Sequence, residues 1–566
     1  MTELECLPYA VGHGGEGMCL VVRLGTHRVM LDCGLRSLSP LLGEAWDHPN
    51  PIRPRSGMVG WGRMPADWVV CSHAHRDHAR GLLKLHEQFP HLPIFASGET
   101  AQLLPTNWLD RPLESIPLFC QALPWRSPVA LADDLTVELL PAGHLPGAAL
   151  TLLRYQSRAE SRSNRSREYC VAYSGDFFLS NGRLVEGMPL TEVRGLAPDV
   201  LIVEGSYGVA RRSRRRRQEN DLADQVSQAL AQGRSVLLPV PLLGLGQELL
   251  MLLRSHHYFT GREFTIWVDR QVAAGCDAYL AILDRLPESV QNFARHQNLF
   301  WDDRVRPLVR RLSSDQNGPD LALEGPCLLL VDDDLPVAQL CDRFCQTGRW
   351  LVSVQAAAGG RLEAEPLRSP HEGDRILYST YELSEHSDGL GTLQLIHNMR
   401  PQHVVFVHGG IDHLSGLAAL DELNSRYQIH CPSAGAALEL PIGESFAQPA
   451  APIERYEGEI STGEGAATVH LPDAIVHSPR WKAFAETGLV EVRWQGSDLV
   501  LRGMSPREVL DRNTAWPDTP DLICCQTCQF YRGQHCRNPA SPLADRRVAP
   551  DGCCPVYASN SDRQPT

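Results

Sequence analysis

Short runs of apolar residues separated by polar turns dominate the first part of the chain, up to about residue 205. Residues 19–24 and 28–31 form two such runs around Gly25-Thr26, which predicts a β-hairpin. The spacing of apolar residues over 81–89 predicts a helix. The same pattern of short apolar runs predicts four further strands, at residues 68–71, 135–140, 149–155 and 169–173.

Helices and strands alternate between about residues 211 and 374. Helical spacing predicts helices at 221–232 and 246–254. Uninterrupted apolar runs are typical of strands buried on both faces, as in a parallel sheet. Four such strands are predicted, at residues 235–239, 264–268, 326–331 and 350–354. This part of the chain therefore predicts an α/β domain.

These changes of pattern predict five segments. Residues 1–206 and 376–440 are rich in short strands, and residues 207–375 between them form an α/β segment. Residues 441–518 hold a linker, rich in Pro, Gly, Ala and Glu up to residue 470, and a small β-rich extension with two or three strands at 469–504. Residues 519–566 form a cysteine-rich tail.

Composition limits the class of protein. Of the 566 residues 43% are hydrophobic, which is enough for a large core and excludes wholesale disorder. The net charge of −14 argues against a protein that coats nucleic acid by bulk charge alone. We find no leader pattern, and Pro239 and Gly244 interrupt the longest apolar stretch, at 236–253, so we expect no membrane span and a cytoplasmic location.

A polar loop rich in histidine follows the strand predicted at 68–71. It reads His73-Ala74-His75-Arg76-Asp77-His78, so three imidazoles and a carboxylate leave one strand end together. Imidazole nitrogen and carboxylate oxygen are ligands that zinc and similar metals prefer. Three later strand ends carry residues of the same kind, His144, Asp176 and His408. Because binding residues collect at strand ends in layered α/β folds, the pattern predicts a metal site.

This ordered set of residues, together with Asp32 in a strand-Asp-Cys-Gly segment, resembles the metallo-β-lactamase superfamily. The resemblance implies a four-layer αβ/βα sandwich that binds two metal ions, zinc or, as the alternative, manganese. The resemblance assigns one metal to His73, His75 and His144, and the other to Asp77, His78 and His408. Asp176 would bridge the two metals. Asp32 would orient the histidine-rich loop of residues 73–78, called the metal loop, through hydrogen bonds.

The long segment between Asp176 and His408 indicates which branch of the superfamily the chain resembles. Asp176 and His408 are 232 positions apart, and the α/β segment fills this gap, as in the β-CASP branch, which includes ribonuclease J and the cleavage and polyadenylation endonucleases. The resemblance makes residues 1–206 and 376–440 the two parts of one metallo-β-lactamase domain, with residues 207–375 as the domain inserted between them. One departure is Leu245, which stands near the place where the branch usually has an Arg. Three segments are similar to the extra motifs of the branch, residues 201–208 with Glu204, 383–388 with His386, and 406–409 with His408.

The resemblance implies a metal-dependent ribonuclease of RNA processing or decay, an endonuclease or a 5′-exonuclease. Two metals would activate the attacking water and clamp the oxygens of an in-line displacement, which makes Asp77 part of the catalytic set. His386 would protonate the leaving oxygen, and Glu204 would hold its imidazole. His408 at the third motif favours RNA over DNA as the partner. The oligomeric state stays open, with a homodimer as one option.

A run of six arginines follows the Glu204 motif. These residues are Arg211, Arg212, Arg214, Arg215, Arg216 and Arg217. One interpretation is a nucleic-acid-binding segment beside the active site, where binding would depend steeply on salt. The other interpretation is a solvated face or a flexible segment, which is the usual role of a charge run.

Cysteines cluster in the tail, which holds several of the 17 Cys of the chain. Cys525, Cys528, Cys536 and Cys554 offer four thiolates, a set that suits one structural zinc or an iron–sulfur cluster. Cys524, Cys553 and His535 compete as ligands, and disulfides or free thiols are the other interpretation. Because the tail is too short for a core of its own, a bound metal would help it to fold.

Two other functions fit parts of the pattern. A nucleic-acid-binding scaffold with little turnover would not need the complete set of metal ligands together with His386. A small-molecule hydrolase of the wider superfamily, for thioesters or lactones, would not need the inserted domain or the pair of Glu204 and His386. Both features therefore favour the nuclease.

Overall fold

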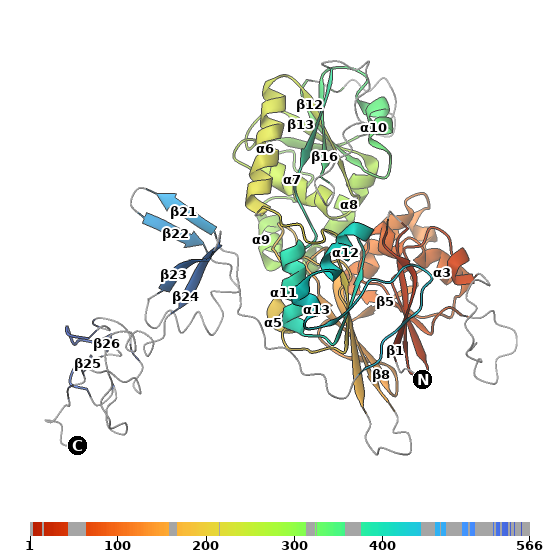
Figure 1. Cartoon of the computed structure of the whole chain (residues 1–566). Helices are drawn as coiled ribbons and strands as arrows, with labels where there is room; N and C mark the ends of the chain where they lie inside the picture. Colours follow the sequence, from red (N-terminus) through yellow and green to blue (C-terminus); the bar gives the residue numbers. More distant parts are fainter. Residues whose placement is uncertain are drawn as a thin grey trace, which may run out of the picture. The chain divides into compact units, whose positions relative to one another are not determined.

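The chain forms two units, Met1–Ala451 and Pro452–Thr566 (Figure 1). The computed structural model describes residues 4–13, 16–42, 64–157, 167–213, 215–312, 323, 325–356 and 375–442, four strands between 459 and 503, and short stretches between 525 and 558. The first unit contains three large sheets.

Two of these sheets have seven strands each and together form the sandwich. The first sheet has the order β20-β1-β2-β3-β4-β5-β6 and the second β19-β18-β11-β10-β9-β8-β7. The strands of the first are β1 Leu4–Val11, β2 Met18–Leu24, β3 His27–Leu31, β4 Trp68–Val70, β5 Ile94–Ser97, β6 Cys120–Leu123 and β20 Leu438–Glu439. Those of the second are β7 Val129–Ala132, β8 Leu135–Pro141, β9 Ala149–Gln156, β10 Glu168–Tyr173, β11 Val200–Glu204, β18 His403–Val407 and β19 Gln428–His430.

The two sheets pack face to face because their strands alternate between two buried surfaces. On β11, Val200 and Ile202 lie in the core between the sheets, together with Leu20 of β2. Leu201 and Val203 point to the other side of the same strand and pack in the layer that the helices cover. Strands with two buried faces read as unbroken apolar runs, which is why the sequence predicts them well.

Helices cover the outer faces of both sheets and complete four layers. Apolar residues of α3 and α4 pack with those of the first sheet, and apolar residues of α11, α12 and α13 pack with those of the second. The predicted αβ/βα sandwich is confirmed. The helices of this part are α1 Ser39–Leu42, α2 Arg76–Ala79, α3 Leu82–Gln88, α4 Gly98–Leu103, α5 Leu190–Val193, α11 Gly389–Met399, α12 Ile411–Ala418 and α13 Asp421–Asn424, with 3-10 helices η1 Leu104–Trp108 and η2 Leu113–Ser115.

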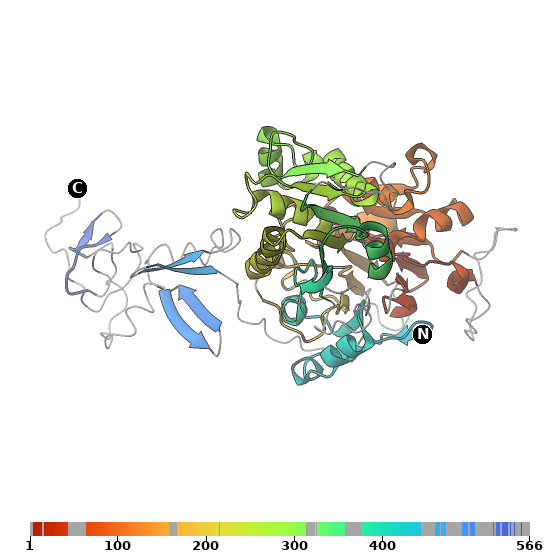
Figure 2. The same cartoon turned by 90° about the horizontal axis from the view of Figure 1, so that it is seen from above.

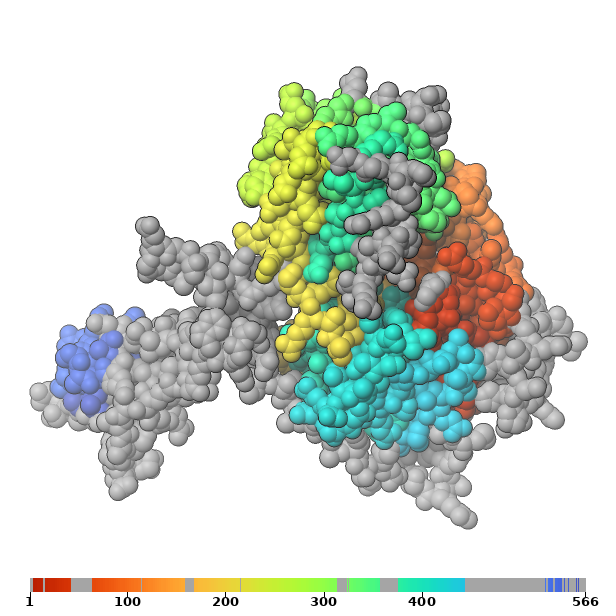
Figure 3. Space-filling model, turned by 45° about the horizontal axis from the view of Figure 1, so that its top comes forward, coloured from red at the N-terminus to blue at the C-terminus, as the bar shows by residue number. Residues whose placement is uncertain are grey.

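The third sheet, of the inserted segment, has six strands in the order β14-β13-β15-β12-β16-β17, and all are parallel. This confirms the predicted buried parallel strands. Figures 1 and 2 show this sheet and its helices, in yellow and green, beside the sandwich, and Figure 3 shows their surfaces meeting the orange and teal parts. The strands are β12 Ser235–Val240, β13 Thr265–Val268, β14 Leu308–Arg311, β15 Leu328–Asp332, β16 Trp350–Gln355 and β17 Ile376–Tyr381.

Two details of the inserted segment differ from the sequence prediction. Strand β17 begins at Ile376, beyond the boundary expected at residue 375, and it pairs with β16 in the third sheet. Helix α6 begins at Arg215 rather than at Asp221. Its first turn lacks apolar periodicity, but Arg215 pairs with Glu219 one turn later and with a buried glutamate of α7. The helices are α6 Arg215–Ala231, α7 Leu245–Ser255, α8 Arg270–Ala281, α9 Glu288–His296 and α10 Val337–Phe344, with the 3-10 helix η3 Leu283–Arg285.

The described residues of the second unit form three small hairpins. Strands β23 Val490–Gln495 and β24 Asp498–Gly503 lie where the sequence predicts two or three strands. Strands β21 Glu459–Gly463 and β22 Ala466–His470 pair within the stretch predicted as linker, because its Gly and Pro content hides a short alternating pattern around the turn. The third hairpin is β25 Tyr531–Arg532 with β26 His535–Cys536. Within the described residues, no helix is long and apolar enough to cross a membrane.

The turn after β3 touches the metal loop so closely that it requires glycine. A Cβ on Gly34 would lie 1.6 Å from the carbonyl oxygen of Asp77, a backbone atom that cannot move aside alone. We therefore expect Gly34→Ala to lower the free energy of unfolding by about 3 kcal/mol, measured by chemical denaturation. Gly416→Ala is the matched control, because its Cβ would meet only Val209 side-chain atoms at 3.8 Å or more, and its change should stay within about 1 kcal/mol. A Gly34→Ala protein as stable as wild type would contradict this expectation.

Candidate metal centre

The ends of six strands from both sheets of the sandwich meet at one site. In the first sheet, β3 ends next to Asp32, and β4 leads into the metal loop, whose last part, from Arg76, is not loop but the short helix α2. In the second sheet, four strand ends carry the remaining polar residues, His144 after β8, Asp176 after β10, Glu204 at the end of β11 and His408 after β18. The core between the sheets thus holds these side chains at a common edge.

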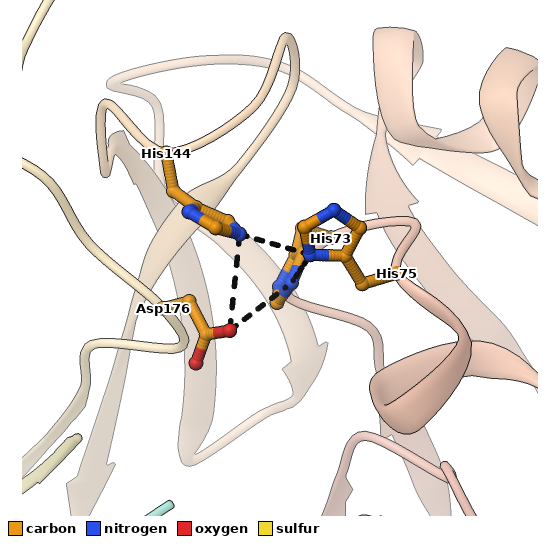
Figure 4. A group of neighbouring side chains, drawn as sticks. All are labelled: His73, His75, His144 and Asp176. Carbon is orange, nitrogen blue, oxygen red and sulfur yellow. Dashed lines mark hydrogen bonds and ion pairs between the residues drawn. The ribbon is translucent and has the colours of Figure 1, made fainter. Parts of the chain in front are cut away.

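The first cluster consists of His73, His75, His144 and Asp176, whose ligand atoms all lie within 4.8 Å of one another. Figure 4 shows the imidazoles of the metal loop approaching from one side and His144 and Asp176 from the other. His73 Nε2 lies 3.2 Å from His75 Nδ1, and His144 Nε2 lies 2.9 Å from the same atom. Asp176 Oδ2 lies 3.5 Å from His73 Nε2.

The second cluster consists of Asp77, His78 and His408, again within 4.8 Å, and it adjoins the other side of Asp176. His408 Nε2 lies 3.2 Å from Asp77 Oδ2. His78 Nε2 lies 3.3 Å from Asp176 Oδ2, and His408 Nδ1 lies 3.5 Å from Asp176 Oδ1. Asp176 therefore stands between the two clusters and offers a carboxylate oxygen to each.

Each imidazole of the two clusters uses one ring nitrogen to donate a hydrogen bond outward. His75 Nε2 faces the carbonyl oxygen of Leu243 at 3.2 Å, and His144 Nδ1 faces the carbonyl oxygen of Glu385 at 2.8 Å. A carbonyl only accepts, so both nitrogens carry their proton. The other outward contacts are His73 Nδ1 with Ser72 Oγ at 3.0 Å, His78 Nδ1 with Asp32 Oδ2 at 2.7 Å, and His408 Nδ1 with Ser206 Oγ at 2.9 Å.

The inward ring nitrogens then present lone pairs to one another. At 2.9 Å, His75 Nδ1 and His144 Nε2 would be two acceptors in contact, which is repulsive unless a cation lies between them. His78 Nε2 and Asp176 Oδ1 are buried, and neither has a hydrogen-bond partner in the described part of the chain. Metal-bound histidines donate their other N–H to a carbonyl or carboxylate in the same way. The donor set therefore fits two metal ions of the zinc type.

Electrostatics in the two clusters favour a cation as well. Burial lowers the pKa of His73 and of His144 well below the usual value, so both are neutral, as a ligand must be. Burial also acts on His78, but the carboxylates of Asp176 and Asp32 outweigh it and raise the pKa of His78 well above its usual value. The negative potential that draws a proton to His78 would equally draw a metal ion.

Asp32 holds the metal loop in place through hydrogen bonds to its carboxylate. Its fully buried carboxylate accepts from Ser72 N at 2.6 Å, Ser72 Oγ at 2.7 Å, Tyr173 Oη at 2.6 Å and His78 Nδ1 at 2.7 Å. Asp32 adopts a φ of 59° and His408 a φ of 51°, both in the left-handed region that non-glycine residues avoid. This backbone strain is held by the surrounding sheet and directs both side chains into the site.

His386 and Glu204 form a pair at the edge of the clusters. His386 Nδ1 lies 2.9 Å from Glu204 Oε2 and 3.2 Å from Glu204 Oε1. Glu204 Oε1 also accepts from Phe177 N, and Ser206 Oγ donates to Glu204 Oε2, so the carboxylate is fixed in place. Burial opposes a charge on His386, but Glu204 and Asp176 raise its pKa well above the usual value. The exposed fraction of the His386 side chain is 21%, which leaves it reachable from solvent.

The structure thus brings together ten predicted residues, namely Asp32, His73, His75, Asp77, His78, His144, Asp176, Glu204, His386 and His408. Sequence reasoning missed several supports of the site. Ser72 and Ser206 each lie within two residues of a predicted site residue, and that adjacency is the signal that could have identified them. Leu243 and Glu385 support the site through their backbone carbonyl groups, which the residue type cannot reveal.

The arginine run and the tail cysteines were further candidate residues of the sequence. Arg212 stacks on the ring of Tyr207 at 3.9 Å, and Arg215 pairs with Glu248 at 3.0 Å, so both are engaged within the fold. Arg211, Arg216 and Arg217 are exposed, while Arg214 and Cys554 lie outside the described residues. In the second unit, Cys525 and Cys536 are buried, and Cys528 N donates to the carbonyl oxygen of Cys525 at 3.0 Å.

The hydrogen bonds of Asp32 predict a loss of metal affinity in Asp32→Asn. The side chain keeps its size, but an amide N–H would face a group that now donates to the carboxylate. We expect zinc affinity to fall by about 10–100-fold, measured by competition with a chelator. Asp134→Asn is the matched control, because Asp134 Oδ1 pairs with His27 Nε2 at 2.7 Å outside both clusters, and it should keep the wild-type affinity. Equal affinities in all three proteins would show that Asp32 does not support the site.

Comparison with known families agrees with this geometry. Residues 27–213 match the Beta-lactamase superfamily domain, and this range contains the metal loop, His144, Asp176 and Glu204. Residues 377–432 match the Zn-dependent metallo-hydrolase RNA specificity domain, and this range contains His386 and His408.

Relatives that match over most of this chain extend the agreement. The chain is 46% identical to the uncharacterized protein sll0514 of Synechocystis sp. over 99% of this chain and 97% of that protein. It is 23% identical to Integrator complex subunit 11 of Gallus gallus, over 84% of this chain and 79% of that protein. It is 24% identical to Cleavage and polyadenylation specificity factor subunit 3 of Dictyostelium discoideum, over 73% and 54%. The chain therefore belongs to the β-CASP branch of RNA-processing nucleases within the metallo-β-lactamase superfamily.

Proposed function

We propose that the protein is a two-metal ribonuclease that hydrolyses phosphodiester bonds and leaves a 5′-phosphate and a 3′-hydroxyl. The observation that carries this proposal is the position of Asp176 between two metal-binding clusters, with the pair of His386 and Glu204 directly beside them. Two adjacent metal sites with a proton donor at their edge match the needs of phosphodiester hydrolysis.

The residues of the two clusters define where the metals would bind. His73, His75 and His144 would hold one zinc ion, Asp77, His78 and His408 the other, and Asp176 would contact both. When bound, the metals would lower the pKa of the attacking water and neutralise the phosphoryl oxygens. Asp32, Leu243 and Glu385 keep the imidazoles in the tautomers that this requires, through the outward hydrogen bonds.

His386 would protonate the leaving oxygen. Its Nδ1–H donates to Glu204, which leaves Nε2 to carry the proton that is transferred. Because Glu204 and Asp176 raise the pKa of His386 well above its usual value, the imidazole is protonated at neutral pH. Glu204 therefore serves as the positioning residue and His386 as the acid.

The relatives support RNA as the substrate. The match over residues 377–432 is to an RNA specificity domain, and it covers both His386 and His408. Another relative, Transcription termination factor FttA of Cenarchaeum symbiosum, is 24% identical over 75% of this chain and 63% of that protein. We further propose that three exposed residues contact the RNA backbone, namely Arg211, which precedes α6, and Arg216 and Arg217 in its first turn.

The test is cleavage of 5′-end-labelled RNA by the zinc-loaded protein, with and without chelator, and with DNA of the same sequence alongside. We expect RNA cleavage that chelator abolishes. Asp176→Ala should be inactive, since it removes the ligand between both clusters. His386→Ala should bind zinc normally and lower kcat by about 10²–10⁴-fold. His296→Ala, an exposed histidine near the end of α9, is the matched control and should keep the wild-type rate.

The products and the variants decide between the alternatives. A ladder of internal fragments indicates an endonuclease, and release of mononucleotides from the 5′ end indicates a 5′-exonuclease. If the zinc-loaded protein cleaves neither RNA nor DNA, the proposal is wrong. If His386→Ala keeps full activity, another group protonates the leaving oxygen.

We also propose that Cys525, Cys528, Cys536 and Cys554 bind one zinc ion or an iron–sulfur cluster in the tail. The burial of Cys525 and Cys536 and the turn between Cys525 and Cys528 support this grouping. Four thiolates on so short a segment would stabilise it by binding a metal.

Metal analysis of anaerobically purified protein tests the tail site. A double variant, Cys525→Ser with Cys528→Ser, should lose about one zinc per chain, or the visible absorption of a cluster, and keep the metals of the two catalytic clusters. Cys431→Ser is the matched control, because Cys431 is an exposed free thiol of the first unit. Unchanged metal content in the double variant would exclude the site.

A further inference from the structure

Arg76 stands inside the metal loop without belonging to either metal cluster. It lies between His75 of the first cluster and Asp77 of the second, at the first position of α2. Its side chain leaves the sandwich and reaches the third sheet, which belongs to the inserted segment. The residue therefore connects the two metal sites with a different sheet.

The partners of Arg76 lie at the end of β15. Arg76 Nη1 lies 3.0 Å from Asp332 Oδ2 and 3.3 Å from Asp334 Oδ1. The exposed fraction of the side chain is 2% for Asp332 and 58% for Asp334, so Asp332 is the partner shielded from water. Asp332 N in turn donates to Asp269 Oδ2 at 2.9 Å, and Asp269 caps the N-terminus of α8. The ion pair thus connects the metal loop to the framework of the third sheet.

Arg76 offsets only part of the cost of burying the Asp332 carboxylate. Burial raises the pKa of Asp332 to about 7, even though Arg76 opposes that shift. Its Oδ1 atom is buried and has no hydrogen-bond partner among the described residues. A buried ion pair of this kind is often no more stabilising than neutral residues of similar size. What the pair provides is a fixed distance between two parts of the chain.

A second contact lies one residue away. His75 Nε2 donates to the carbonyl oxygen of Leu243, in the loop that precedes α7 of the inserted segment. Helix α8 also contacts α4 and η1 of the sandwich. Two neighbouring residues of the metal loop, His75 and Arg76, therefore hold the inserted segment, one through a neutral hydrogen bond and one through an ion pair.

We propose that the ion pair of Arg76 with Asp332 is a latch that fixes the inserted domain against the metal loop, and that Arg76 is a positioning residue for the RNA strand bound between them. This inference rests on the proposed ribonuclease function. The metal ligands have their own supports in Asp32, Leu243 and Glu385, so the latch acts on substrate placement and not on the metals. Its loss should raise KM far more than it lowers kcat.

A competing role for Arg76 makes the opposite prediction. If Arg76 bound an RNA phosphate directly, Asp332 and Asp334 would compete with that phosphate for its guanidinium. Removing the charge of Asp332 would then free Arg76 and lower KM. If the ion pair instead connects the inserted domain to the metal loop, removing either Arg76 or Asp332 should raise KM by the same amount, because the connection needs both side chains.

The experiment compares Arg76→Ala, Asp332→Asn and the double variant in steady-state RNA cleavage. We expect each single variant to raise KM by about 10-fold, with kcat within about 3-fold of wild type, and the double variant to add nothing further. The matched control is Arg311→Ala with Asp277→Asn, which breaks an ion pair of 2.5 Å within the inserted segment and should leave KM unchanged. A lower KM for Asp332→Asn, or independent effects that multiply in the double variant, would overturn the latch.

Thermal unfolding of the same variants tests the pair without RNA. Without Arg76 the pKa of the buried Asp332 rises further, and folding at neutral pH must then protonate this group or bury its charge. The unfolding midpoint of Arg76→Ala should therefore fall, and adding Asp332→Asn should restore most of that loss. Absence of this recovery would overturn the latch even in an active enzyme. A wild-type protein that cleaves no RNA but shows the recovery would instead refute the proposed function and leave the pairing of Arg76 with Asp332 established.

Discussion

Five imidazole rings meet at one edge of the sandwich with their lone pairs facing inward, and the rest of the site follows from that arrangement. Each ring must give its outward N–H to an acceptor, or its tautomer would be undefined. The acceptors are two carbonyl groups, two serine hydroxyls and one carboxylate, and each lies at or just beyond a strand or helix end. The close approach of the two sheets, the strained backbone of Asp32 and His408, and the glycine turn at Gly34 all serve to place these groups.

The inserted segment takes part in this arrangement although it supplies none of the seven side chains of the two clusters. Leu243 orients His75, and Glu385, which follows β17 of the third sheet, orients His144. The metal sites of the sandwich are therefore completed by a domain that lies outside it. The inserted segment thus contacts the metal loop at two neighbouring residues, through the hydrogen bond of Leu243 with His75 and the ion pair of Asp332 with Arg76.

The sequence was sufficient to predict which residues meet in the two clusters and most of the strands, because each of these residues follows a strongly apolar run and His and Asp in that position are distinctive. It was insufficient where the determining partner is distant in the chain. Arg212 and Arg215 look like members of a solvated charge run, yet one stacks on Tyr207 and the other pairs with Glu248. The early start of α6 has the same cause, since its first turn depends on tertiary ion pairs rather than on apolar spacing.

The position of β18 between β11 and β19 has a consequence for how the protein is made. This strand carries His408, and it enters the second sheet only after the whole inserted segment has been synthesised. Until then the growing chain exposes the edge of β11 and holds an incomplete second cluster, while His73, His75, His144 and Asp176 are already present. The side chains of the first cluster are therefore synthesised before the inserted segment, whereas the second cluster gains His408 only after that segment has been made.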